Sequence, residues 1–253
     1  MTWDLATLLP TLQTVWGGAI LTFARIASII SVAPGFGEQV VPMRVKFGIA
    51  LAFTIVIAPI AQQDRPPEFA TLISEVLTGL FFGLFLRFFV QVLQMTGSIA
   101  AQATSLSQIF GGMAGVDPQP AMGRVFLIAG LALAAMMGLH VHIAKYILAS
   151  YAMVPQGAIV SAEIAVDLGV HQIGQSFAFA FTLAAPFLIA SVCYNLTLGF
   201  VNKAMPQLMV SFVGAPAITA GGLLLLLLCS PLILMLWVDA FSEFIDSPFG
   251  RVR

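Results

Sequence analysis

Charged residues are scarce in this chain of 253 residues, because Asp, Glu, Lys and Arg together make up only 8% of it. They are absent from four long stretches: Phe88–Val116, Val125–Ala144, Leu168–Asn202 and Ala204–Val238. Each stretch reaches or exceeds the ~20 apolar residues that a helix needs to cross a bilayer core. This scarcity excludes a soluble domain of ordinary composition and predicts an integral membrane protein whose backbone is satisfied within helices.

Cysteine and histidine are also rare, and their positions do not indicate a metal site. Cys193 and Cys229 both lie within apolar stretches without a CxxC or Cys/His context, which favours buried free thiols. His140 and His142 are two residues apart, so on a helix they point to different faces. His171 stands alone. We therefore expect no metal and no cofactor.

Motifs of catalysis and of nucleic-acid binding are missing too. The chain contains no GxSxG, HExxH, P-loop or dinucleotide-binding fingerprint. Its net charge of −1 lacks the basic footprint of a nucleic-acid-binding protein. Paired carboxylates or a nucleophile with a nearby base are not evident either. We expect a protein that is not an enzyme.

The apolar runs predict an all-α membrane protein with about six long, kinked helices arranged as hairpins in one membrane domain, residues 1–253. The expected segments are 12–33, 47–60, 69–101, 125–149, 173–201 and 208–238. Residues 62–68 read as a polar connection, and residues 153–172 are of mixed polarity. Prolines within or beside most segments predict kinks, since proline removes a helix hydrogen-bond donor.

Basic residues do not give a membrane orientation. Arg44, Lys46, Arg124 and Lys203 fall on one set of alternate connections, while Arg65, Arg251 and Arg253 fall on the other. Either one of the expected spans is misplaced, or the protein in its final state is not a simple bundle of helices that cross the membrane in alternating directions.

Four charged side chains, those of Arg25, Glu75, Arg87 and Lys145, lie inside apolar segments or near their ends. A lipid-facing charge near the bilayer centre is costly, so these groups are expected to face protein or water. Glu75, Gly79, Gly83 and Arg87 are spaced four apart on one predicted helix, and the two glycines permit close approach of another helix. Alternatively, Glu75 and Arg87 lie at the two interfaces and snorkel.

The connection 102–123 is unusual because Asp117 is its only charged residue. Its apolar side chains alternate with glycines that give the backbone freedom. Such a segment suits either a gate loop that closes a conduit and is displaced, or a re-entrant turn packed on neighbouring helices. The candidate gate-loop residues are Ile109, Phe110, Gly111, Gly112, Met113, Gly115, Val116, Asp117 and Pro118.

The turn after the fifth segment carries a recognisable motif. Asn202-Lys203-Ala204-Met205-Pro206-Gln207-Leu208, followed by Gly214-Ala215-Pro216, resembles the signature of the FliR/SctT family of type III secretion export-gate proteins. That family typically shows Asn-Arg-x-x-Pro-Gln-Leu and then Gly-Phe-Pro. Here Lys203 replaces the arginine, which keeps the charge but loses the planar fork, and Ala215 replaces the phenylalanine.

The resemblance covers nearly the whole chain. Arg25 with Pro34-x-Phe36-Gly37 is similar to the family's N-terminal block, and the stretch from Gln102 to Pro120 is similar to its middle. Ser150-Tyr151 and Pro155-x-Gly157 also match in order. The retained Gly214-x-Pro216 favours the flagellar branch over the related injectisome branch.

This resemblance implies a subunit of the flagellar export gate, in which the protein assembles with FliP and FliQ into a pore for unfolded flagellar subunits, with FlhB associated. It implies a FliP-like part, residues 1–165, and a FliQ-like hairpin and tail, residues 166–253. The resemblance also implies that residues 108–122 correspond to a loop that plugs the pore. The implied location is the bacterial inner membrane within the basal body, displaced outward from the usual bilayer level, which would account for the undecided charge count.

A different class of function, a secondary transporter for a small solute, remains an alternative. Such a protein would be expected to show an internal repeat and broken helices that converge on one site. The chain shows no convincing repeat, and its intramembrane charges are scattered.

Overall fold

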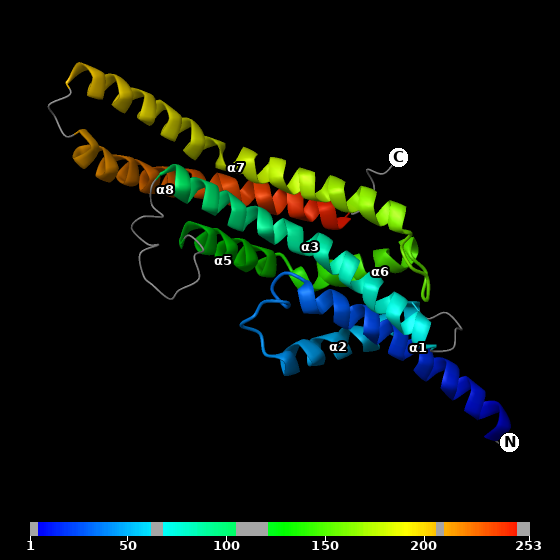
Figure 1. Ribbon diagram of the computed structural model, residues 1–253. Helices are drawn as coiled ribbons and strands as arrows, with labels where there is room; N and C mark the ends of the chain where they lie inside the picture. Colours follow the sequence, from blue (N-terminus) through cyan, green and yellow to red (C-terminus); the bar gives the residue numbers. More distant parts are fainter. Residues whose placement is uncertain (1–4, 62–67, 105–120, 206–209, 247–253) are drawn as a thin grey trace. The chain divides into compact units, whose positions relative to one another are not determined.

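The computed structural model describes residues 5–61, 68–104, 121–205 and 210–246, and these ranges contain helices and no strand. The helices are labelled in Figure 1. In chain order they are α1 (Leu5–Val32), α2 (Met43–Ala61), α3 (Phe69–Ala103), α5 (Ala121–Met136), α6 (Leu139–Met153), α7 (Ala162–Ala204) and α8 (Val210–Asp246).

Four of the described helices are long and apolar enough to cross a membrane: Met43–Ala61, Phe69–Ala103, Ala162–Ala204 and Pro216–Asp246. The pair α5 and α6 adds a fifth span if the two are taken as one broken crossing, since they are bent by 81° at their junction. The expected all-α integral membrane fold is confirmed.

One expected segment is wrong as a single helix. Residues 125–149 do not form one continuous rod, because the chain turns between α5 and α6 at Gly138, which has φ 82° and ψ 45°. The Gly138 amide bonds to Ala135 O at 3.1 Å, and its carbonyl accepts the Val141 amide at 2.8 Å. A left-handed residue cannot continue a right-handed helix, and glycine adopts this conformation without steric cost. Other boundaries also differ. The helix α1 begins at Leu5 rather than at residue 12, α2 at Met43 rather than at residue 47, and α7 at Ala162 rather than near residue 173, while α8 ends at Asp246 rather than at residue 238.

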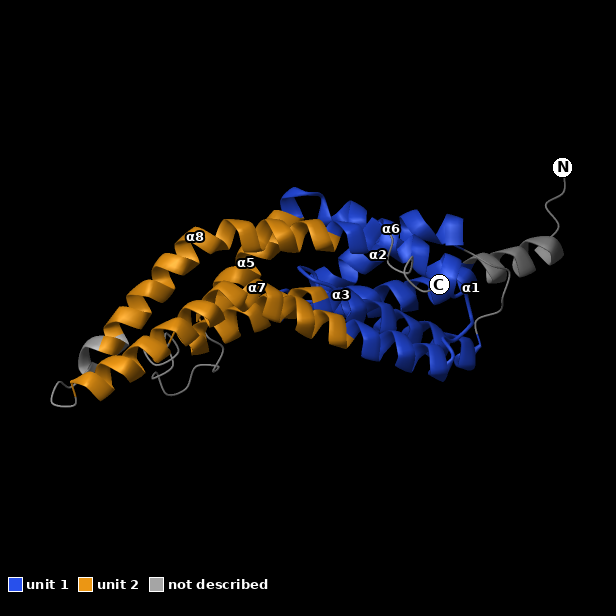
Figure 2. Cartoon of the chain, turned by 90° about the horizontal axis from the view of Figure 1, so that it is seen from above, with its two compact units in different colours: residues 1–88, 135–172, 242–253 blue, residues 89–134, 173–241 orange. Residues whose placement is uncertain are grey.

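The chain packs as two compact units, which are coloured separately in Figure 2. Unit 1 comprises residues 1–88, 135–172 and 242–253, and unit 2 comprises residues 89–134 and 173–241. Each unit therefore draws residues from both of the parts that the sequence distinguished, 1–165 and 166–253. The likeness of those two parts to FliP and FliQ stays a prediction.

The core of unit 1 lies among α1, α2, α6 and the first part of α3. Its fully buried side chains include Leu21, Ile26, Ile29, Ile30, Ile57, Phe82, Leu86, Ile143, Tyr146 and Ile147. Tyr146 is apolar over its ring and donates its hydroxyl to Phe82 O at 3.0 Å, so its polar end is satisfied inside the core.

The core of unit 2 is organised around Trp237 on α8, whose side chain is fully buried. Its indole Nε1 donates to Phe89 O at 2.7 Å, and its ring stacks on Phe241 with centroids 5.1 Å apart. The other arm of the unit, from α7, contributes the buried Leu183 and Phe187. Within unit 2, α7 and α8 form the two arms of a long hairpin (Figure 1), as expected from the sequence.

Candidate functional site

Arg25 on α1 and Glu75 on α3 form a buried ion pair in unit 1. The Arg25 Nε atom is 2.6 Å from Glu75 Oε2, and Nη2 is 3.0 Å from Oε1. Both side chains have a relative exposure of 0%. The planar guanidinium thus meets the carboxylate at two points, which is the strongest geometry for such a pair.

The remaining N–H groups of Arg25 reach the end of α6 and the chain that follows it. Nη1 donates to Val154 O at 2.8 Å and to Ser150 O at 3.4 Å, while Nη2 donates to Pro155 O at 3.4 Å. Ser150 O also accepts the Val154 amide at 2.9 Å, and carbonyls at a helix C-terminus carry the negative end of its dipole. With these contacts all five N–H donors of Arg25 have an acceptor.

Glu75 also binds the segment between α6 and α7. Its Oε1 accepts the Gly157 amide at 2.6 Å, in addition to the bond from Arg25. Gly157 has φ 79°, so its amide is directed by a left-handed turn that glycine adopts readily. The ion pair therefore joins α1 and α3 to residues 154–157, the segment between α6 and α7.

Two uncharged side chains complete this cluster. The Tyr151 ring lies 4.1 Å from the Arg25 Cζ atom, within the range of a cation–π contact. Gln156 is fully buried and donates its Nε2 to Gly18 O at 3.0 Å and to Thr22 Oγ1 at 3.2 Å. No structural role of Tyr151 or Gln156 was predicted from the sequence, although Ser150-Tyr151 and Pro155-x-Gly157 are blocks that match the family.

The two glycines of the α3 stripe lie against α1. A Cβ atom on Gly79 would be 2.5 Å from Arg25 O, and one on Gly83 would be 3.1 Å from Ile29 O. The first distance is too short for any side chain, so α1 and α3 approach each other so closely only because Gly79 has none. This approach brings the Arg25 and Glu75 side chains within reach of each other.

Arg87, at the end of the stripe, pairs with Glu38 in the segment between α1 and α2. These two side chains are 25% and 20% exposed, so this pair is less enclosed than the pair of Arg25 and Glu75. The structure therefore places the two charged residues of the stripe in different surroundings: Glu75 inside the core and Arg87 near the surface of unit 1.

The residues of the hairpin motif that the structure describes are spread over two helices. Asn202 and Lys203 lie exposed in the last turn of α7. Gly214 is buried near the start of α8, where its carbonyl accepts the Tyr194 hydroxyl at 2.7 Å, and Pro216 is exposed within that helix. Pro206 and Gln207 lie outside the described residues, and so does the whole candidate gate loop, Ile109–Pro118.

The cluster around Arg25 can hold three segments together, but it offers no reacting group. The guanidinium and the carboxylate are saturated by each other and by backbone atoms. Over the ranges that the structure describes, no group of three or more His, Cys, Asp or Glu side chains could hold a metal ion. The arrangement therefore has a structural role, which is to hold α1, α3 and residues 154–157 together within unit 1.

Comparison with known proteins extends over almost the whole chain. Residues 17–244 match the model of a family described as bacterial export proteins, family 1. Flagellar biosynthetic protein FliR of Caulobacter vibrioides is 33% identical over 236 residues, covering 90% of this chain and 94% of that protein. The FliR protein of Aquifex aeolicus is 25% identical over 231 residues, 89% of this chain and 90% of its own length. The FliR protein of Escherichia coli is 27% identical over 230 residues, 87% of this chain and 86% of its own.

Proposed function

The chain belongs to the bacterial export proteins, family 1, the family of the flagellar biosynthetic protein FliR, and on this basis we propose that it is a subunit of the flagellar protein export gate. Family membership gives it a role in flagellar protein export. The proposal adds that the chain forms part of the pore through which unfolded flagellar subunits pass, and that flagellum assembly requires it.

The observation that carries this proposal is the 33% identity to a flagellar FliR protein over 90% of the chain. A match of this length includes the apolar segments, the connections between them and the hairpin motif. Relatives from four further organisms carry the same flagellar name. These relatives favour the flagellar branch over the injectisome branch.

We place the gate in the bacterial inner membrane, at the flagellar basal body. Four to five apolar helices make the chain a multi-pass membrane protein. An assembly displaced outward from the usual bilayer level accounts for basic residues that give no clear orientation, since the positive-inside rule applies to helices left in a bilayer. The gate role requires no catalysis by this chain.

The proposed partners are FliP and FliQ within the gate, FlhB beside it, and the unfolded export substrates that pass through it. Three large apolar side chains of α8, Leu224, Leu227 and Leu228, are between 58% and 71% exposed. Their exposure supports the proposal of partners, because such side chains must be covered by other subunits or by lipid. Residues 108–122 are proposed to plug the pore, with Ile109, Phe110, Met113 and Val116 excluding water from a constriction.

Mass measurement after gentle detergent extraction tests the proposal. A gate subunit should be recovered in a large hetero-oligomer with FliP and FliQ when the genes are expressed together. A small-solute transporter would instead run as a monomer or as a small homo-oligomer. Recovery of this chain alone, under conditions in which FliP and FliQ are both present in the membrane, would overturn the gate assignment.

A further inference from the structure

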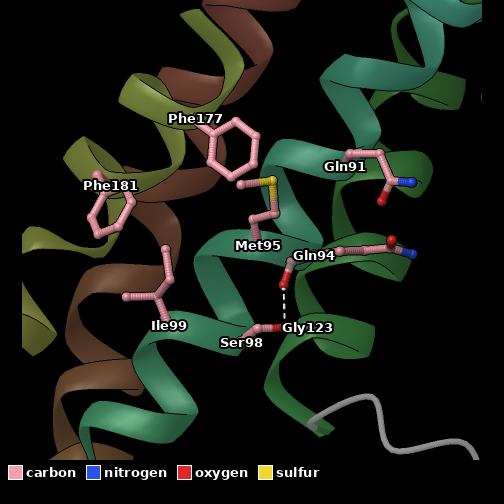
Figure 3. Close-up of a pocket in the computed structure, with 8 residues that line it drawn as sticks. All are labelled: Gln91, Gln94, Met95, Ser98, Ile99, Gly123, Phe177 and Phe181. Atoms are coloured by element: carbon pink, nitrogen blue, oxygen red, sulfur yellow. Dashed lines mark hydrogen bonds between the residues drawn. The ribbon is translucent and has the colours of Figure 1, made fainter. Parts of the chain in front are cut away.

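A groove of about 360 Å³ opens on unit 2 where α3, α5 and α7 meet. Its lining residues are shown in Figure 3: Gln91, Gln94, Met95, Ser98 and Ile99 from α3, Gly123 from α5, and Phe177 and Phe181 from α7. The groove shares no residue with the Arg25 cluster of unit 1.

Close packing fixes the walls of this groove. A Cβ atom on Gly97 would be 2.4 Å from Gly123 Cα, so α3 and α5 are in backbone contact beneath it. On the other side, the Thr96 hydroxyl donates to Val92 O at 2.8 Å, and its oxygen lies 3.4 Å from Ala180 O, so α3 and α7 are also in close contact. These contacts hold both walls in place without any occupant, so the groove is a preformed surface.

One wall of the groove carries two carboxamides. Gln91 and Gln94 lie one turn apart on α3, in the stretch Phe88–Val116 that has no charged residue. Within the part of the chain that the structure describes, neither amide has a hydrogen-bond partner. Ser98 donates its hydroxyl to Gln94 O at 2.8 Å, and this bond uses the backbone carbonyl rather than the amide.

Unpaired amides in an apolar helix limit what can cover them. Each carboxamide has two donors and an acceptor, and hydrocarbon offers no partner for any of them. Lipid chains would therefore leave both glutamines unsatisfied, at a considerable cost in free energy. The groove needs an occupant that carries hydrogen-bonding groups of its own.

The opposite wall is apolar, and no residue that the structure describes covers it. The rings of Phe177 and Phe181 are 51% and 53% exposed, and Figure 3 shows Met95 and Ile99 on the same side of α3 as these rings. Water would satisfy the two amides but leave both rings wet. An occupant must therefore be apolar on one side and polar on the other.

The floor of the groove is made of small residues, Ser98 and Gly123, which allow another backbone to come close. Small residues beneath, Gln side chains as hydrogen-bonding groups and large apolar side chains at the edge are the features by which transmembrane helices recognise each other. We propose that this groove receives a transmembrane helix from another subunit of the export gate. That helix presents an Asn, Gln, Ser or Thr side chain to Gln91 and Gln94 and an apolar side chain to Phe177 and Phe181. The inference rests on the proposed function and assigns the gate contact to a defined surface.

Site-specific photocrosslinking in the purified, complete gate tests this contact. A benzophenone amino acid at Phe181 should yield an adduct that mass spectrometry maps to an apolar helix of another subunit. The matched control carries the same label at Ile189, which is 64% exposed on α7 but does not line the groove, and should not give that adduct. An adduct of the Phe181 label with phospholipid, with an export substrate or with a second copy of this chain would overturn the proposal, as would the absence of any adduct.

Removing the amides gives an independent test. The double variant Gln91→Leu with Gln94→Leu should lower recovery of this chain in the gate at least tenfold, with its level in the membrane unchanged. Gln175→Leu, an exposed glutamine of α7 outside the groove, is the control and should assemble normally. Normal assembly of the double variant would refute the groove contact and leave the gate function intact. Failure of the unaltered chain to co-purify with any other subunit would instead refute the proposed function.

Discussion

The Arg25 guanidinium and the Glu75 carboxylate meet at two points, with Nε 2.6 Å from Oε2 and Nη2 3.0 Å from Oε1, and neither side chain is exposed. An ion pair in a low-dielectric interior is stable only when its other hydrogen-bonding groups are also satisfied. Here the carbonyls of Val154 and Pro155 and the amide of Gly157 supply those bonds. The pair is therefore part of a network that includes the backbone between α6 and α7.

Removing one charged partner from this network should strongly destabilise the folded protein. Arg25→Ala leaves the Glu75 carboxylate buried without its counter-charge, and losses of about 3–5 kcal/mol are typical of such changes. We expect a thermal unfolding midpoint in detergent well below that of the unaltered chain. Arg87→Ala is the control, because its pair with Glu38 is partly exposed, so removing Arg87 leaves no fully buried unpaired charge. Equal losses in the two variants would contradict the special role of the buried pair.

Exchanging the two charges should not restore stability. In the double variant Arg25→Glu with Glu75→Arg, a carboxylate would face the carbonyls of Val154 and Pro155, and a guanidinium would face the Gly157 amide. Each backbone group would then meet a side chain of the wrong hydrogen-bonding type. The expected unfolding midpoint is no higher than that of Arg25→Ala. Recovery to the level of the unaltered chain would show that the ion pair alone matters.

The glycines of α3 should differ in their tolerance of a methyl group. Gly79→Ala places its Cβ 2.5 Å from Arg25 O, whereas Gly83→Ala places it 3.1 Å from Ile29 O, so the first change should destabilise more. Gly48→Ala in α2 is the control, because nothing lies within 4 Å of its Cβ position. In a helix that change should be neutral or stabilising by up to about 1 kcal/mol. Thermal unfolding of the three variants in one detergent gives the order, and a Gly79→Ala as stable as Gly48→Ala would contradict the close approach of α1.

Several of these features follow from the sequence, and others do not. The spacing of Glu75, Gly79, Gly83 and Arg87 indicated a helix face that packs tightly and carries charges in need of partners. It did not identify α1 as the neighbour, because any helix can fill a glycine groove. The backbone carbonyls that receive Arg25 carry no sequence signal at all, since every residue has one.

The break at Gly138 shows a second limit. The residues around it, Met137 and Leu139, are as apolar as the helices on both sides, so hydropathy indicates one continuous segment. Only the φ of 82° distinguishes this glycine from those that lie within helices elsewhere in the chain. Apolar runs thus report which residues enter the membrane region but not where the backbone turns within it.

The end of α7 offers a test of the hairpin motif. Lys203 lies in the last turn of α7, where a cation interacts favourably with the helix dipole by about 0.3–1 kcal/mol. We predict that Lys203→Glu and Pro206→Ala both impair assembly or export, the charge reversal more strongly. Secretion of a hook or filament subunit by a complemented strain measures this effect. Full secretion with Lys203→Glu would show that the hairpin motif is not needed for assembly or export.

The proposed plug gives a separate prediction. Deletion of Phe110–Gly115 should leave a gate that assembles but leaks small ions, because the apolar side chains that exclude water would be lost. Membrane potential and ion conductance in cells that express the complete gate report the leak. An assembled deletion variant with unchanged potential and conductance would identify the segment as a packed re-entrant turn.

Secretion of flagellar subunits is the decisive test of the proposed gate role of this chain in flagellar protein export. A strain from which the gene is deleted should release no hook or filament subunit into the medium, although it still synthesises them inside the cell. Complementation with the unaltered chain should restore secretion, and complementation with Arg25→Ala should restore little of it. Normal secretion of these subunits by the deletion strain would contradict the proposed gate function.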